Sequence, residues 1–176
     1  MASIQIIQGD ITTLQVDAIV NAANKSLLGG GGVDGAIHFA AGPALLEECR
    51  SLGGCLKGEA KLTRGHNLPA KFIIHTVGPE HGYEEGREAE LLKQCYENVL
   101  GIARDNGLRT VAFPSISTGA FGYPKDEAAK IAIDTVRQYV SAHPDAFDEI
   151  FFVCFSEFDT LIYQSIFDSG SFAFDA

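Results

Sequence analysis

The chain has 176 residues, close to the size of one domain of about 100–200 residues. Its apolar fraction of 46% is ordinary for a globular protein. It holds 13 Lys and Arg against 23 Asp and Glu, which gives a net charge of −10. This charge argues against nonspecific binding to DNA, RNA or an anionic membrane surface, since each requires a basic patch. A small phosphorylated ligand is still compatible, because backbone N–H groups can hold phosphate without a basic side chain.

The four cysteines are scattered and form no C-x-x-C pair, so we expect reduced thiols and no metal site. The segment from Met1 to Gln8 has neither a basic region nor a long apolar run, which argues against a signal or transit peptide. No apolar run approaches the roughly 18 residues of a membrane span. We therefore expect a soluble, cytoplasmic protein with one domain over residues 1–168 and a loose tail over residues 169–176.

Apolar patterns predict strands that alternate with helices along the chain. Strands are expected over residues 4–8, 16–20, 60–63, 72–77, 110–113 and 150–155, with the third at an edge of the sheet. Helices are expected over residues 33–41, 44–52, 88–106 and 125–142, followed by a last helix that begins at the cap Ser156 and ends at Phe167. This alternation is typical of an α/β fold whose sheet is covered on both faces.

Three loops rich in Gly, Asn, Ser and Thr follow expected strands: Gly9–Thr12, Asn21–Gly32 and Ser115–Gly122. Ligands of open α/β sheets bind outside the carboxyl ends of the strands, so the three loops together predict one composite pocket. The alternative is that each loop is only a tight turn. A single loop of this kind would favour that alternative, but the occurrence of three such loops favours a shared pocket.

The second loop contains four consecutive glycines directly before an expected helix. Gly30–Gly35 matches G-x-G-x-x-G, but Asn21–Leu28 separates it from its strand, which argues against a dinucleotide fingerprint. The chain contains no P-loop motif. The remaining prediction is physical: glycines let the backbone approach a phosphate, and a helix N-terminus favours negative charge.

Polar side chains flank this glycine run. Asp34 and His38 are four residues apart and share one helix face, although an Asp in a first helical turn is also explained by the helix dipole alone. Asn21 and Asn24 frame an Ala-Ala step, and their amides suit sugar hydroxyls. His75 lies inside an apolar strand, so we interpret it as a core histidine with satisfied hydrogen bonds rather than as a functional residue.

Five segments together resemble the macrodomains. They are Gly9–Thr12, Val20–Asn24, Leu28–His38, His75–Pro79 and Phe113–Pro124. The Asn-Ala-Ala-Asn step and the Gly-Gly-Gly-Gly-Val-Asp-Gly-Ala-Ile-His run are similar to the hydrolase branch, often called MacroD-type, which includes bacterial O-acetyl-ADP-ribose deacetylases. The resemblance spans nearly the whole chain and implies a three-layer α/β/α macrodomain with a mixed central sheet.

The resemblance also implies a site for ADP-ribose. Asp10 would bind the adenine amino group, Ile11 would contribute its backbone, and Phe155 would lie against the adenine ring. The pyrophosphate and distal ribose would be held by Gly30, Gly31, Gly32, Val33, Ser117, Thr118, Gly119, Ala120, Phe121 and Gly122. Relatives often have Tyr in place of Phe121, so a hydrogen bond from that hydroxyl is absent here while the aromatic cover remains.

Four polar residues would surround the reacting end of this ligand. By the same resemblance, Asn24 would hold the distal ribose with Asn21 beside it. Asp34 would orient or deprotonate the attacking water, and His38 would support it.

The implied function is hydrolysis of an ester on the distal ribose of ADP-ribose, without a cofactor. Expected substrates are O-acetyl-ADP-ribose and mono-ADP-ribose joined to acidic side chains of proteins, and we expect a monomer without DNA or membrane partners. Two alternatives stay open: a reader module that binds ADP-ribose without turnover, and a phosphatase acting on ADP-ribose-1″-phosphate. The combination of Asn24 with Asp34 favours the enzyme over the reader.

Overall fold

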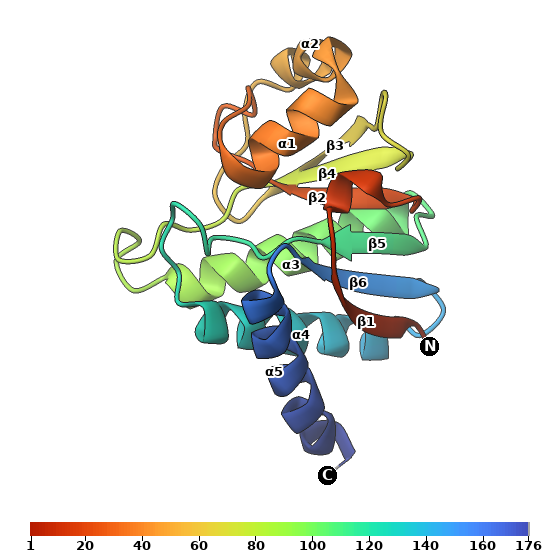
Figure 1. The fold of residues 1–176 in the computed structure, drawn as a ribbon, viewed down its shortest axis with the longest axis vertical. Coiled ribbons are helices and arrows are strands. Elements are labelled where there is room, and N and C mark those ends of the chain that lie inside the picture. The colour runs from red at the N-terminus through yellow and green to blue at the C-terminus, as the bar shows by residue number, and fades with distance from the viewer. Residues whose placement is uncertain (176) are drawn as a thin grey trace.

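A computed structural model describes the backbone of residues 1–175 and the side chains of residues 1–170. Its six strands form one sheet in the order β1-β6-β5-β2-β4-β3 (Figure 1). The strands are β1 Ser3–Gln8, β2 Ala18–Ala22, β3 Ala60–Arg64, β4 Phe72–Thr76, β5 Thr110–Phe113 and β6 Glu149–Cys154. Every neighbouring pair is parallel except β3 and β4, so the sheet is mixed, with its one antiparallel strand at an edge as the sequence predicts.

Five α-helices of the described chain connect and cover these strands. They are α1 Gly32–Ala41, α2 Pro43–Leu52, α3 Glu88–Asp105, α4 Lys125–Ala142 and α5 Glu157–Asp175, and a short 3₁₀-helix, η1, covers Ile11–Thr13. The oxygen Oγ of Ser156 accepts a hydrogen bond from the backbone N–H of Asp159, so Ser156 caps α5 as expected. Within the described residues, no helix combines the length and the apolarity needed to cross a membrane.

Strand side chains alternate between two hydrophobic cores. In β2, Ala18 and Val20 pack with α3 and α4, whereas Ile19 between them packs with α1 and α2. In β5, Val111 and Phe113 join the first core and Ala112 joins the second. Because successive side chains of a strand point to opposite faces, this alternation places the sheet between two helical layers. The three-layer α/β/α architecture is therefore confirmed.

Several boundaries differ from the sequence expectations by one or two residues, and the end of α5 differs by more. Strand β2 ends at Ala22 rather than at Val20, because its pairing with β4 continues to the register pair Ala22–Thr76, so Asn21 lies in a strand instead of a loop. Helix α5 does not end at Phe167 but continues to Asp175. Residues 169–175, expected to form a loose tail, are thus helical; side-chain bonds such as that from Gln164 to Asp168 support the turn that precedes them. Ala176 lies outside the described residues.

Candidate active site

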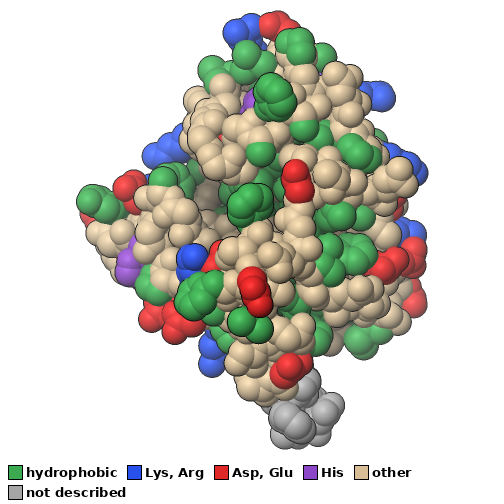
Figure 2. Space-filling view, viewed as in Figure 1, with side chains coloured by type: hydrophobic (Ala, Val, Ile, Leu, Met, Phe, Trp, Pro, Cys, Tyr) green, Lys and Arg blue, Asp and Glu red, His purple; other side chains and the backbone are tan. Residues whose placement is uncertain are grey.

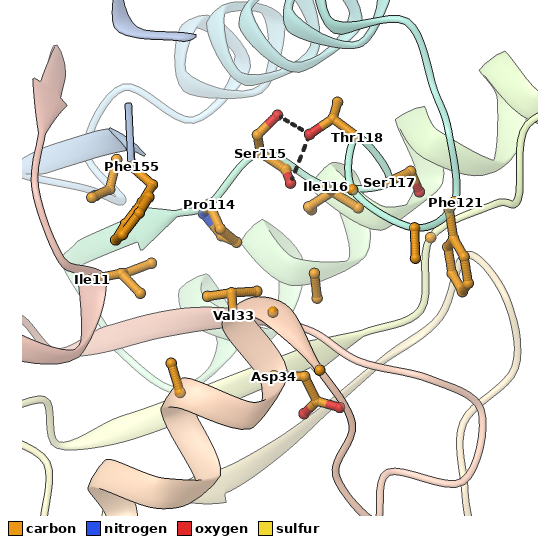
Figure 3. Close-up of a pocket in the computed structure, with 18 of the residues that line it drawn as sticks. Ile11, Val33, Asp34, Pro114, Ser115, Ile116, Ser117, Thr118, Phe121 and Phe155 are labelled. Carbon is orange, nitrogen blue, oxygen red and sulfur yellow. Dashed lines mark hydrogen bonds between the residues drawn. The ribbon is translucent and has the colours of Figure 1, made fainter. Parts of the chain in front are cut away.

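A cavity of about 750 Å³ opens where the parallel strands β1, β2, β5 and β6 end. Figure 2 shows this face to be hollowed. The glycine loop and the start of α1 form one wall, and the loop after β5 forms the opposite wall (Figure 3). Parallel strands bring their carboxyl ends to one edge of a sheet, which is how three loops distant in sequence meet in one pocket as predicted.

One end of the cavity is aromatic and apolar. The exposed Phe155 follows β6, and the buried Ile11 begins η1; their side chains lie at the same end of the cavity (Figure 3). Asp10 caps η1, because its Oδ1 accepts hydrogen bonds from the backbone N–H of Thr12 at 3.0 Å and from its hydroxyl at 2.7 Å. Both bonds use Oδ1, so the cap does not occupy the second carboxylate oxygen of Asp10.

The first turn of α1 supplies backbone donors to the cavity wall. Gly31 is the N-cap of this helix and provides no side-chain hydrogen bond. The N–H groups of a first helical turn have no acceptor within the helix, so those of Gly32 and Val33 are suited to an anion. Gly30, Gly31, Gly32 and Val33 all line the cavity. No Lys or Arg is among the described residues that line it, so an anion there would rely on backbone donors.

Asp34 lies in this first turn and is only 4% exposed, yet it lines the cavity. Its Oδ1 accepts a 2.9 Å hydrogen bond from Nδ2 of Asn21 and lies 3.4 Å from Nε2 of His38. Burial raises the pKa of Asp34 above its ordinary value, while the bond from Asn21 and the nearby His38 act in the opposite direction. A carboxylate with a raised pKa is a stronger base than an exposed one.

Asn24 organises the glycine loop as well as lining the cavity. Its Nδ2 donates a 2.8 Å bond to the backbone oxygen of Gly29, and its Oδ1 accepts from the hydroxyl and backbone N–H of Ser26 and from the backbone N–H of Leu27. An amide nitrogen carries two hydrogens, so one N–H of Asn24 is not used by this bond to Gly29.

The loop after β5 has a strained backbone and an aromatic tip. Ser117 has a φ of +68°, which is unusual for a residue with a side chain, and its buried hydroxyl has no hydrogen-bond partner among the described residues. The backbone of Phe121 is fixed from outside the loop, because its oxygen accepts a 2.8 Å bond from the backbone N–H of His81. Phe121 lies at the end of the cavity opposite Phe155 (Figure 3).

Most of the predicted site residues line this cavity. Those that do are Asp10, Ile11, Asn24, Gly30, Gly31, Gly32, Val33, Asp34, Ser117, Thr118, Gly119, Ala120, Phe121 and Phe155. Three predicted residues do not line the cavity: Asn21, His38 and Gly122. Asn21 belongs to β2, which is longer than expected, and its fully buried side chain is hydrogen-bonded to Asp34. His38 lies in α1 with its Nε2 3.4 Å from Oδ1 of Asp34. Gly122 follows Phe121 at the end of the loop, in a turn where the backbone N–H of Gly122 donates to the backbone oxygen of Gly119.

Other lining residues were not predicted individually, although five of them lie in the three loops that were predicted to form the pocket. These other lining residues are Gly9, Ala22, Ala23, Ala36, Gly78, Pro114, Ser115, Ile116, Val153, Cys154 and Asp159. Several of them lie at the same strand ends as the predicted residues, and this position in the sequence could have identified them. Gly78 is required by packing, since a Cβ there would lie 2.1 Å from Oγ of Ser117. The described residues include no cluster of three or more His, Cys, Asp or Glu that could hold a metal ion.

Known proteins with similar sequences cover almost the whole chain. A Macro domain-containing protein of Chlorobaculum tepidum, CT2219, is 60% identical over 168 residues, which are 95% of this chain and 96% of that protein. The O-acetyl-ADP-ribose deacetylase of Enterobacter cloacae is 53% identical over 93% of this chain and 92% of its own length. The human ADP-ribose glycohydrolase MACROD2 is 52% identical over 92% of this chain, which spans only 38% of that protein.

Solved structures lead to the same family. The Oceanobacillus iheyensis macrodomain with ADP has a TM-score of 0.89 and 46% identity, over 93% of this chain and 89% of that one. The Trypanosoma brucei macrodomain in complex with ADP-ribose has a TM-score of 0.88 and 46% identity, over 92% of this chain and 68% of that one. The model of the Macro domain family matches residues 20–132. By sequence, by fold and by its loop-built cavity, the chain belongs to the Macro domain family.

Proposed function

We propose that this protein binds ADP-ribose and hydrolyses esters on its distal ribose. The substrates are O-acetyl-ADP-ribose and mono-ADP-ribose attached to acidic side chains of proteins. The single observation that supports hydrolysis most strongly is the buried carboxylate of Asp34 on the cavity wall, in the first turn of α1 and beside the glycine loop. The names of the deacetylase and glycohydrolase relatives point in the same direction.

The shape of the cavity supports one orientation of the ligand. The adenine ring would lie against Phe155 and Ile11, with its amino group toward the carboxylate of Asp10. The diphosphate would lie between the first turn of α1 and the loop after β5, where backbone N–H groups can bind it. The distal ribose would then reach the end occupied by Phe121 and Asp34, so binding of the whole nucleotide would position the ester for attack.

The reaction is the addition of water to the ester carbonyl. Asp34 would accept a proton from the attacking water while the oxygen of the water bonds to the carbonyl carbon. The bond between the acyl group and the ribose oxygen then breaks, and the proton held by Asp34 passes to the ribose oxygen, so that ADP-ribose and the carboxylic acid are released. Backbone N–H groups of the glycine loop would stabilise the negative charge that develops during this step. Asn24 would hold the ribose through the N–H that is not bonded to Gly29.

The proposal also covers the oligomeric state, the cellular compartment and the partners of the protein. It would act as a monomer in the cytoplasm, with ADP-ribosylated proteins as partners. The four cysteines are all free and buried, which supports a reducing compartment.

Product analysis of the wild-type protein tests the proposed reaction. Incubation with O-acetyl-ADP-ribose should release ADP-ribose and acetate, and incubation with ADP-ribose-1″-phosphate should release phosphate much more slowly. Tight binding of ADP-ribose without release of acetate would favour a reader instead, and faster phosphate release would favour a phosphatase.

A further inference from the structure

A chain of four buried polar side chains runs beneath α1 and ends at Asp34. Thr63 Oγ1 lies 2.8 Å from Nε2 of His75, whose Nδ1 lies 3.1 Å from Nδ2 of Asn21. The same Nδ2 of Asn21 donates to Oδ1 of Asp34 at 2.9 Å. Thr63 is 1% exposed, His75 and Asn21 are fully buried, and Asp34 is 4% exposed. Of the four, only Asp34 lines the cavity.

Three adjacent strands hold this chain in place. Thr63 belongs to β3, His75 to β4 and Asn21 to β2, and Asn21 pairs directly with His75 in the parallel register. Ile73 lies two residues before His75 in β4 and packs with α1 and α2, so His75 faces the same side of the sheet. The two strands adjacent to β4 thus contribute the residues at either side of the His75 ring, and the backbone of the sheet fixes their separation.

The positions of the hydrogens in this series of four side chains follow from the acceptor at its end, the carboxylate of Asp34. The Asn21 nitrogen has two hydrogens, and one of them is donated to the carboxylate of Asp34. The other can be donated to His75 only if Nδ1 of the ring has a lone pair, which requires the ring proton to be on Nε2. That proton is then donated to the hydroxyl oxygen of Thr63. Burial lowers the pKa of His75 to about 3, which keeps the ring neutral as this arrangement requires.

We propose that Thr63 and His75 are positioning residues for the reaction: they hold the amide of Asn21 with its nitrogen toward Asp34, and thereby keep Asp34 fixed and ionised. This inference rests on the proposed role of Asp34 in hydrolysis. In the observed orientation the Oδ1 of Asn21 has no hydrogen-bond partner among the described residues. An unpaired buried oxygen is costly, so the two bonds donated by the amide nitrogen must offset that cost.

Without the acceptor at Thr63, the proton of His75 can move to Nδ1. The Asn21 amide would then turn its oxygen toward His75 and also toward the carboxylate of Asp34, which would lose its donor. Loss of a hydrogen bond to a carboxylate raises its pKa. Among the described residues, His38 on α1 and Cys49 on α2 also interact electrostatically with Asp34; burial raises the pKa of the Cys49 thiol to about 11, so this thiol stays neutral.

Three variants separate this role from simple packing. Thr63→Val removes the hydroxyl while keeping the branched shape, and Thr63→Ser keeps the hydroxyl while removing a methyl group. Thr135→Val makes the same change at a buried threonine of α4, in the other core. For each variant, kcat for O-acetyl-ADP-ribose is measured from pH 5 to 9, with the Kd for ADP-ribose and the thermal midpoint alongside.

The proposal predicts a distinct result for Thr63→Val. The acidic limb of its kcat profile should move up by about one pH unit, so that kcat falls about tenfold on this limb and recovers as the pH rises. The Kd for ADP-ribose should stay within about twofold, because Thr63 does not line the cavity. Thr63→Ser and Thr135→Val should keep the wild-type profile. A wild-type profile for Thr63→Val, or an equal loss at every pH, would overturn the proposal.

A measurement without turnover separates this proposal from the proposed function. The pKa of Asp34, measured by carboxyl ¹³C NMR, should be higher in Thr63→Val than in Thr63→Ser. If the wild-type protein hydrolyses no ester, the proposed function fails, and this comparison still tests the hydrogen-bonded chain. Equal pKa values of Asp34 in the two variants would overturn the positioning role even if the wild-type protein is an active hydrolase.

Discussion

Gly30 leaves space that Asp34 needs. A Cβ added at Gly30 would lie 3.1 Å from Oδ2 of Asp34 and 3.3 Å from Nδ2 of Asn24. Both distances are shorter than an ordinary van der Waals contact, so a side chain here would displace one of these two polar groups. The requirement for glycine at this position therefore arises from the carboxylate and the amide of the site and not from the backbone, whose φ at Gly30 is not positive.

We expect Gly30→Ala to reduce turnover more than binding. The added methyl group would displace the carboxylate of Asp34, whereas the backbone donors of the loop would remain. The kcat for O-acetyl-ADP-ribose should fall at least about tenfold, since misplacement of a catalytic group by about 1 Å can cost more than that. Gly101→Ala in α3 is the control, because Gly101 does not line the cavity and a Cβ there would lie 3.7 Å from Oη of Tyr139, an ordinary van der Waals distance. Equal kcat values in the two variants would contradict this prediction.

The carboxylate of Asp10 should contribute to affinity through the adenine amino group. Asp10→Ala should weaken ADP-ribose binding by about 1.5–3 kcal/mol, or about 10- to 150-fold in Kd, as measured by calorimetry. Because Asp10 also caps η1, the control is a ligand rather than a variant. Inosine diphosphate ribose has no amino group, so its binding should change much less. An equal loss of affinity for ADP-ribose and for inosine diphosphate ribose would show that the effect arises from the lost cap of η1 and not from the adenine amino group.

Phe121 should act as an apolar cover. Phe121→Tyr should leave the fold unchanged and alter kcat only moderately, since the ring remains and the bond to His81 uses the backbone. Phe121→Ala should reduce kcat much more, because the reacting end of the cavity would open to water. If the alanine variant is as active as the wild-type protein, Phe121 serves only to pack its loop.

Acid should destabilise the folded protein partly through His75. The pKa of this ring falls from 6.5 to about 3 on burial, so between these values the unfolded chain binds a proton that the folded chain does not. Stability therefore falls as the pH decreases through this window, by up to about 1.4 kcal/mol per pH unit from this one group. Urea unfolding at pH 7 and pH 5 checks this in an Asp34→Asn background, where the carboxylate is removed from the titration.

The control for this effect replaces the titrating ring. In the same background, His75→Phe, or the smaller His75→Asn, should lose less stability than the histidine protein between pH 7 and pH 5. The same decrease in all of these proteins would show that His75 does not titrate in this way.

Local sequence signals were enough to predict most helices and strands, but not the buried side chains that contact Asp34 from behind the cavity wall. The apolar period of residues 125–142 matches α4 at both ends, because its pattern and the preceding Pro124 are local features. The end of β2 was misplaced because it depends on pairing with β4, which is distant in sequence. The interpretation of His75 as a buried histidine with both ring nitrogens bonded is confirmed, whereas the positioning role proposed for it differs from the expectation that it has no function. The link from His75 to Asp34 through Asn21 could not be predicted, since it depends on the order of three strands in the sheet.

The role of Asp34 as the base is the central claim, and Asp34→Asn tests it most directly. The amide has the shape of the carboxylate and can still accept the bond from Asn21, but it cannot take a proton from water. The measurement is single-turnover release of ADP-ribose from O-acetyl-ADP-ribose, with calorimetric affinity for ADP-ribose on the same samples. We predict hydrolysis slower by ~10²-fold or more, with affinity unchanged or slightly improved as repulsion from the diphosphate falls. Hydrolysis by Asp34→Asn at the wild-type rate would contradict the claim.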